Sequence, residues 1–338
     1  MNVRAESPNE EFSAEIEDIL SDYDISYSSG EIESFSFADI FGIVRESVIS
    51  GLSAPFRMFS VLITVIIFTS VMKSVNTVQN ENIFNLVSVI SAVTVVSPQL
   101  IAVYSETKDA IERGGGFMLV FVPVFTGITV ACGGIASGSV YNIMILGASE
   151  FIVRLSESFL MPLLSVTAVL SVTGSVFPQN SVNGIVSLLK KTITMGISIT
   201  MSLFIGFVTL KCSIAGRTDG LTAKTAKFLI SGTVPIIGGA VSDAYSTVRG
   251  SFDIIQGTVG TVGVFAVFLI LLIPVFRLMA FRLVMWICSA VSDLFSSETV
   301  SALLKGFDSG LAIAQSVLVC HALIFILCSA ILMQTVQR

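Results

Sequence analysis

Three ionisable residues share one helical stripe inside an otherwise apolar part of the chain. Glu150, Arg154 and Glu157 are spaced at i, i+4 and i+7, and Gly147 lies one turn earlier on the same stripe. A carboxylate and a guanidinium at this spacing can form an ion pair along a helix. In a membrane such a pair either lines a polar interior or marks the end of a span at the water interface. Glu150 and Arg154 are therefore candidates for an intramembrane ion pair, with the interfacial pair as the alternative.

A further acid, Asp243, follows an apolar segment that is rich in proline and glycine. Charges inside membrane spans are costly and mark pathways for ions or substrates, so Asp243 is a candidate pathway residue. A cap on a helix that starts after Gly239 explains the same residue equally well. Arg277 and Arg282 flank a short apolar stretch. We expect their long side chains to extend to an interface rather than to bind a substrate.

The sequence contains no arrangement typical of catalysis or of metal binding. Its one histidine, His321, lies in an apolar run without an acid, serine or cysteine at a useful spacing, so we expect it to form a hydrogen bond between helices. The five cysteines form no CxxC pair, which indicates small core residues. Walker A, H-E-x-x-H and EF-hand motifs do not occur. We predict that the protein is not an enzyme and binds no cofactor or metal ion.

The composition is that of an integral membrane protein. Of 338 residues, 53% are hydrophobic and 12% are charged, and the mean hydropathy is +0.90, whereas soluble domains carry about 25% charged residues. A helix needs about 20 apolar residues to cross a bilayer, so the longer uncharged runs predict spans and the shorter ones re-entrant segments or half-helices, about seven to nine elements in all. The runs are 58–72, 83–105, 117–133, 135–151, 159–177, 193–210, 228–241, 261–275 and 311–333.

Two of these regions repeat a pattern at an offset of 112 residues, the separation of Pro123 and Pro235. Each copy places a proline and several glycines inside an apolar run, which frees backbone groups that hydrocarbon cannot satisfy. Such breaks are tolerated where the segment is buried in protein or lines a water-filled cavity. Shared composition is the alternative explanation of the repeat. The candidate pathway or broken-helix residues are Pro123, Gly127, Gly138, Pro235, Gly238, Gly239 and Asp243.

The charges of two predicted loops indicate that the copies enter the membrane from opposite faces. The loop 106–116 precedes the first copy and carries two basic residues, whereas the loop 211–227 precedes the second copy and carries four. Basic residues are enriched in cytoplasmic loops, so the second loop is placed inside and the first, near Gly114, outside. The result is an inverted repeat with halves at about 83–177 and 193–292. Lys190 and Lys191 then lie outside, against the same rule.

The beginning of the chain has a different composition. Residues 1–36 are acidic and poor in apolar side chains, which predicts a disordered segment on the outer face of a bacterial membrane. Over 37–56, apolar residues recur at helical spacing. This pattern predicts an amphipathic helix lying on the membrane or, alternatively, a helix packed on the protein itself. The membrane domain then covers 57–338. No signal peptide is visible after Met1, which indicates a trimmed mature form with an added initiator methionine.

Two stretches resemble the stage III sporulation protein AE family. They are FVPVFTGITVACGGIASGSVYN at 121–142 and VPIIGGAVSDAYSTVRGS at 234–251, and the similarity runs from about residue 37 to the end. The resemblance implies an endospore-forming bacterium and a multi-pass protein of the mother-cell membrane facing the forespore. It implies a multi-protein channel, or feeding tube, that joins the two cells and is needed for late forespore gene expression. The implied partners are the other membrane subunits and the bilayer, with no nucleic acid.

The sequence leaves three functional hypotheses open. The first is a polytopic subunit of such a transenvelope complex. The second is a self-contained secondary transporter for a small solute, with Pro123 and Pro235 marking two broken helices. In the third, the glycines only allow tight helix packing and form no pathway. All three share one predicted fold class, an all-α polytopic transmembrane helix bundle with re-entrant or broken helices and a possible inverted repeat.

Overall fold

The computed structural model describes residues 45, 49, 51–75, 81–131, 146–148, 150–176, 184–206, 238–295 and 297–334. This part of the chain is helical almost throughout and contains no strand, which confirms the all-α prediction. A helix over Gly184–Gly206 is called helix 184–206 below. The other elements are α3 (Ser53–Val75), α4 (Glu81–Ala131), the π-helix η3 (Ser156–Leu160), α6 (Met161–Val176), α8 (Gly238–Leu294) and α9 (Glu298–Gln334).

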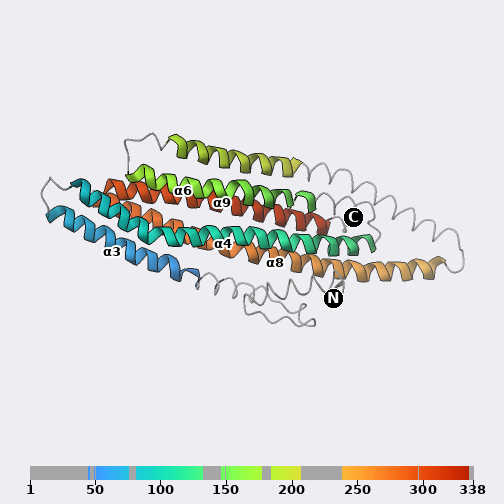
Figure 1. Cartoon of the computed structure of the whole chain (residues 1–338). Helices are drawn as coiled ribbons and strands as arrows, with labels where there is room; N and C mark the ends of the chain where they lie inside the picture. The colour runs from blue at the N-terminus through green and yellow to red at the C-terminus, as the bar shows by residue number, and fades with distance from the viewer. Residues whose placement is uncertain are drawn as a thin grey trace, which may run out of the picture.

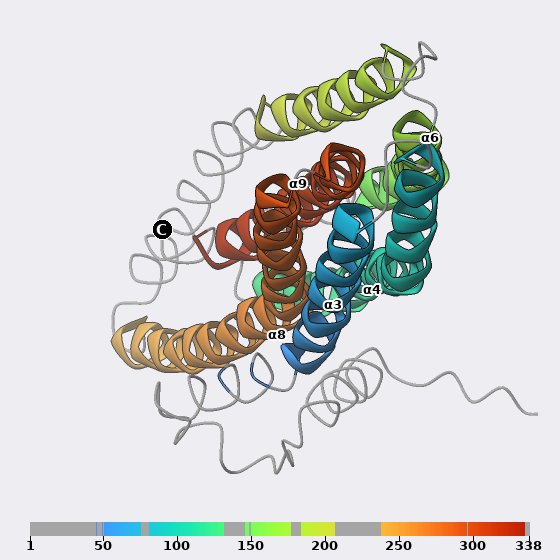
Figure 2. The ribbon, with the colours of Figure 1, turned by 90° about the vertical axis from the view of Figure 1, so that its left-hand side faces the viewer.

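The helices lie side by side along one direction, and several of them begin or end together at one end of the bundle (Figure 1). At this end, called the turn end, α3 ends and α4 begins, α6 ends and helix 184–206 begins, and α8 turns into α9. The α8–α9 turn is closed by hydrogen bonds: the backbone N–H of Ser297 donates to the Ser292 carbonyl, and the Ser292 hydroxyl donates to the Ser297 carbonyl. Figure 2 looks onto the turn end and shows helix 184–206 at the margin of the bundle.

Pairs of contacting residues fix the relative directions of the three longest helices. Residue numbers rise along α4 where they fall along α8, so these helices are antiparallel. Numbers rise together along α4 and α9, so these two are parallel. The pairs are Glu106 with Arg277, Phe121 with Gly263, Tyr104 with Gly310, and Gly114 with Phe325.

Among the described residues, six helices are long and apolar enough to cross a membrane. They cover Ser53–Met72, Ile83–Ile128, Leu146–Gly174, Gly184–Gly206, Gly263–Leu294 and Glu298–Ser329. Since the chain is also strongly hydrophobic as a whole, it is a multi-pass membrane protein. The candidate span of α4 is 46 residues long and includes the charged segment 106–113, and its length of about 69 Å at 1.5 Å per residue is more than twice the roughly 30 Å of a bilayer core.

The core between α4, α8 and α9 is built around a phenylalanine ladder on α4. Phe117, Phe121 and Phe125 follow one another at i+4 and are fully buried. The ring centroids of Phe117 and Phe121 are 5.4 Å apart, and those of Phe121 and Phe125 are 5.6 Å apart. These are favourable separations for stacked or tilted aromatic pairs. On α8, Gly263 lies directly against the Phe121 ring, so the absence of a side chain there lets the two helices approach.

The continuity of α4 overturns two predictions. Residues 106–116 are helical and form no loop, so the predicted spans 83–105 and 117–133 belong, as far as Ala131, to a single helix. Pro123 does not break α4, which also passes through Pro98. A proline inside a helix costs about 3 kcal/mol, but burial of each large apolar side chain contributes about 1.5–3 kcal/mol, and the ladder buries three around Pro123. The placement of Gly114 in an outside loop is also wrong, because Gly114 packs against Phe325.

Several other predicted residues can be located on the backbone. Gly127 is exposed on α4, while Gly238 and Gly239 begin α8, with Asp243 in its second turn. Because α8 starts at Gly238, Asp243 does not occupy a cap position. Gly138 and Pro235 lie outside the described residues, as does most of the predicted amphipathic helix. The part of the chain that the structure describes contains no re-entrant segment.

Candidate functional site in the helix bundle

Charged side chains from five of the described elements collect at one level of the bundle, which we call the charged belt. Placing an ionisable residue in the middle of an apolar helix costs free energy, so such residues are candidates for a functional role. The partners of each residue show how that cost is reduced. Contacts across the bundle place these residues at a common level. The belt consists of Glu106, Lys108, Asp109, Glu112 and Arg113 on α4, Glu157 on η3, Lys190 and Lys191 on helix 184–206, Arg277 and Arg282 on α8, and Asp308 on α9.

The first interhelical contact of the belt joins α4 to α8. Arg277 donates from Nη1 to Oε1 of Glu106 at 2.6 Å, and the two side chains are 35% and 29% exposed. The guanidinium also lies against Gly51, where an added Cβ would be 3.2 Å from Nε. Arg277 thus has a carboxylate partner on another helix, which the sequence did not predict, and its extension to an interface stays a prediction. It neutralises a carboxylate on a neighbouring helix, which removes much of the cost of placing either charge inside the bundle.

The second contact joins α8, α9 and helix 184–206. Arg282 donates from Nε to Asp308 at 3.1 Å and from Nη1 to the Gln315 side-chain carbonyl at 2.7 Å. The sequence did not predict these partners of Arg282, and its extension to an interface stays a prediction. Lys190 interacts electrostatically with the same Asp308 carboxylate. Asp308 is thus shared by cations from two other helices.

Ion pairs along single helices occur both within the belt and outside it. Lys108 pairs with Glu112 at 2.8 Å on α4, and Glu157 of η3 interacts electrostatically with both. Glu150 and Arg154 form the i, i+4 ion pair that their spacing allows, with side chains 40% and 76% exposed. That exposure favours the alternative in which the pair faces the surroundings rather than a closed polar interior.

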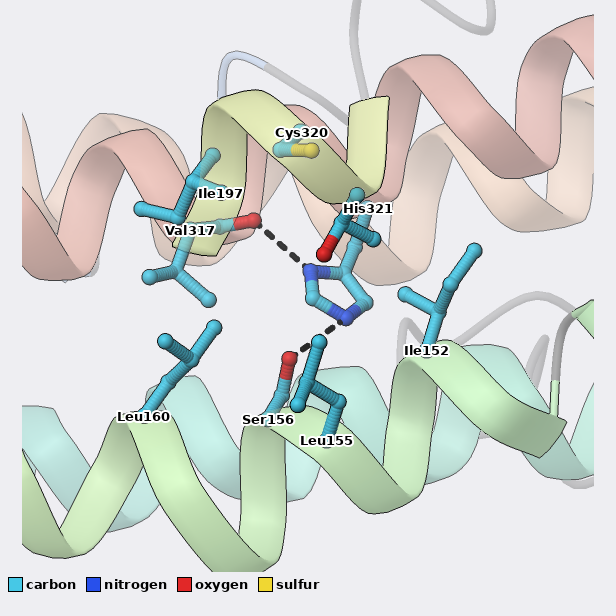
Figure 3. Close-up of a pocket in the computed structure, with 9 residues that line it drawn as sticks. Ile152, Leu155, Ser156, Leu160, Ile197, Val317, Cys320 and His321 are labelled. Carbon is cyan, nitrogen blue, oxygen red and sulfur yellow. Dashed lines mark hydrogen bonds between the residues drawn. The ribbon is translucent and has the colours of Figure 1, made fainter. Parts of the chain in front are cut away.

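A second polar site lies between η3 and α9, where His321 meets Ser156 (Figure 3). The imidazole Nε2 is 3.0 Å from the Ser156 hydroxyl, and Nδ1 is 2.7 Å from the Val317 carbonyl. A carbonyl can only accept, and the ring lies near the carbonyls of both Val317 and Ile152; in the tautomer in which Nδ1–H donates to Val317, Nε2 accepts from the Ser156 hydroxyl. Both side chains are almost fully buried. The expectation that His321 forms a hydrogen bond between helices is confirmed.

The local helix geometry brings Ser156 into this position. Ser156 is the first residue of the π-helix η3, and an extra residue in a helical turn shifts the side chains that follow and often marks a functional site. The surrounding pocket is lined by apolar side chains, among them Ile152, Leu160 and Ile197. Serine and histidine at this distance have the spacing of a nucleophile and its base. Because Ser156 and His321 are both buried among apolar side chains, we interpret their contact as a hydrogen bond that stabilises the packing of η3 against α9.

The Ser156–His321 bond gives a testable stability effect. Ser156→Ala leaves Nε2 without its donor in a buried site, so it should lower the free energy of unfolding by about 1–2 kcal/mol. Thermal melting of the purified protein in detergent measures this change. Ser165→Ala is the matched control, because that hydroxyl bonds only to the Met161 carbonyl of its own helix. Equal melting temperatures for the two variants would show that the interhelical bond contributes nothing.

Comparison with known proteins identifies the family to which the chain belongs. A sequence profile described as stage III sporulation protein AE matches residues 20–335. The chain belongs to the stage III sporulation protein AE family. The resemblance inferred from 121–142 and 234–251 is thereby confirmed.

A curated member of the stage III sporulation protein AE family is similar over part of its length. The stage III sporulation protein AE of Bacillus subtilis (strain 168) is 24% identical to this chain over 183 residues. The similarity covers 54% of this chain and 46% of the relative, so it spans about half the length of that protein. No solved structure matches the chain.

Proposed function

We propose that this protein is a multi-pass membrane subunit of a transenvelope channel, or feeding-tube, complex that joins mother cell and forespore. In this proposal it resides in the mother-cell membrane with its acidic N-terminal segment outside the cytoplasm. It is required for late forespore gene expression and acts without catalysis. Membership of the sporulation family and the six apolar helices support a sporulation role in a membrane.

The observation that best supports a subunit rather than an isolated protein is the length of the apolar surface. On α4, apolar residues continue on both sides of Glu106, and large side chains are exposed on either side, including Ile90 and Leu119. One bilayer covers about 30 Å, whereas the two apolar runs of α4 and the charged segment between them extend over about 69 Å. Apolar surface beyond the bilayer is covered most effectively by other protein subunits.

The direction of the helices supports the inverted repeat as part of this proposal. The described parts of the two copies are residues 117–131 of α4 and the beginning of α8 from Gly238. Because α4 and α8 are antiparallel, these two segments point in opposite directions, as an inverted repeat requires.

Co-purification from sporulating cells tests the proposed complex. A tagged full-length protein, solubilised in mild detergent, should be recovered in a large assembly with other membrane proteins at fixed stoichiometry. A deletion strain should fail to activate a late forespore reporter while early reporters remain active. Recovery of the chain alone, together with normal late reporter activity in the deletion strain, would contradict the proposal.

A self-contained secondary transporter is the second candidate, favoured by the ion pairs in the middle of the helices. In transporters, paired charges inside the helix bundle mark where a substrate or coupling ion binds, and Glu106–Arg277 and Arg282–Asp308 are pairs between helices of the bundle. Uptake of a labelled solute by liposomes that contain only the purified chain would support this candidate. Liposomes that take up no more solute than protein-free vesicles would exclude it for the solutes tested.

A further inference from the structure

Helix 184–206 is the most loosely held of the six candidate spans. Only 11% of its apolar window is buried in the bundle, against 56% for the windows in α8 and α9. Its inward stripe consists of Val186, Ile193, Thr200 and Phe204. The rest of this helix therefore faces the surroundings of the bundle, at the margin seen in Figure 2.

The outward stripe of this helix combines a lysine with large apolar side chains. Leu188, Met195, Ile199 and Leu203 are exposed and follow one another at helical spacing, with Lys191 between the first two. A lysine within such a stripe can extend its ammonium group to a headgroup while its stem lies along apolar surface. The stripe thus offers one cation next to a surface for hydrocarbon.

Three exposed hydroxyl groups on the same helix are bonded within the helix and so do not oppose contact with hydrocarbon. Thr192, Thr194 and Ser198 each donate to the backbone carbonyl four residues earlier, at 2.9–3.0 Å. An unpaired polar group in hydrocarbon costs several kcal/mol, and these internal bonds avoid that cost. The exposed face of helix 184–206 is therefore suited to acyl chains over the residues that follow the lysines.

The local charge near the lysines is not balanced by the protein. Within the described residues neither Lys190 nor Lys191 forms an ion pair, and the Asp308 carboxylate that attracts Lys190 is already bonded to Arg282. Arg282 and Lys190 share the Asp308 carboxylate, and the exposed Lys191 adds a further positive charge next to Lys190, so cations outnumber acids around Asp308. A negatively charged group that binds from outside the bundle would restore neutrality.

We propose that Lys190, Lys191 and the outward stripe of helix 184–206 form a binding site for an anionic phospholipid. The phosphate of the headgroup lies against the two ammonium groups, and an acyl chain follows Met195, Ile199 and Leu203. The site recognises the lipid by negative charge next to an apolar surface. This inference does not depend on the proposed channel function.

Native mass spectrometry of the full-length protein tests the site. The protein is purified in mild detergent and given an equimolar mixture of phosphatidylglycerol and phosphatidylcholine. Each lysine near an anionic surface contributes about 1 kcal/mol, a factor of about 5 in affinity. The Lys190→Gln, Lys191→Gln double variant should therefore bind phosphatidylglycerol about 30-fold more weakly than the parent, with phosphatidylcholine binding unchanged. The double arginine variant should keep the preference.

Two controls keep the result specific. Lys305→Gln removes a lysine that Asp293 already neutralises at 2.8 Å, so it should leave lipid binding as in the parent. Millimolar inorganic phosphate should not displace the lipid, because the acyl chain contributes to binding. The proposal is overturned if the parent retains both lipids equally, if the glutamine variant keeps its preference, or if free phosphate competes. The last outcome would identify a site for a soluble anion.

Discussion

Replacing Arg277 with Gln should lower the free energy of unfolding by about 2–3 kcal/mol. Removing one partner of a fully buried ion pair costs about 3–5 kcal/mol, and removing one partner of an exposed pair costs about 0–1 kcal/mol. The Arg277 and Glu106 side chains are about one third exposed, so the expected loss lies between these limits. Thermal melting of the purified protein in detergent measures the effect.

A matched exposed pair on the same protein separates this effect from a general loss of charge. The Arg154 side chain is 76% exposed in its pair with Glu150, so Arg154→Gln should lower stability by less than about 1 kcal/mol. The double variant Glu106→Gln, Arg277→Gln should recover part of the loss, because it leaves no unpaired charge. If Arg277→Gln melts like Arg154→Gln, the interhelical pair does not hold α4 to α8.

The features that sequence reasoning predicted correctly are those encoded locally. The apolar runs and low charge predict membrane helices because every turn of such a helix is apolar and uncharged. The Glu150–Arg154 ion pair could likewise be predicted from the sequence, since residues at i and i+4 are neighbours on any helix. For His321, the sequence predicted the kind of interaction but not the partner. Ser156 is 165 residues away and is brought to the histidine by packing and by a π-helix that has no clear sequence pattern.

The loop predicted at 106–116 was wrong for a related reason. Charged residues between two apolar runs normally indicate a loop in water, whereas a partner on another helix makes one of these charges, Glu106, acceptable inside the bundle. That partner is Arg277, which lies 171 positions further along the chain. The predicted break at Pro123 failed because burial of the neighbouring phenylalanines outweighs the local preference of proline. Lys190 and Lys191, which opposed the predicted topology, are the residues on which the proposed lipid site depends.

Gly263→Ala should destabilise the protein although alanine is the better helix former. A Cβ added at Gly263 would lie 2.1 Å from Cε2 of Phe121, too close for any real contact. The Phe121 ring is fully buried between Phe117 and Phe125, so it has little room to move. Overpacking of this kind costs about 1–3 kcal/mol, which exceeds the roughly 1 kcal/mol that alanine gains over glycine in a helix.

The control for this substitution is Gly127→Ala on α4, where an added Cβ meets nothing within 4 Å. No steric clash opposes the higher helix propensity of alanine here, so the free energy of unfolding should rise by about 0.5–1 kcal/mol and the melting temperature should rise with it. Phe121→Leu combined with Gly263→Ala should recover part of the lost stability, since the smaller side chain leaves room for the methyl group. Melting of Gly263→Ala at or above the parent temperature would mean that α4 and α8 do not approach through this glycine. A Gly127→Ala protein that is stable but inactive in sporulating cells would instead assign Gly127 to a pathway.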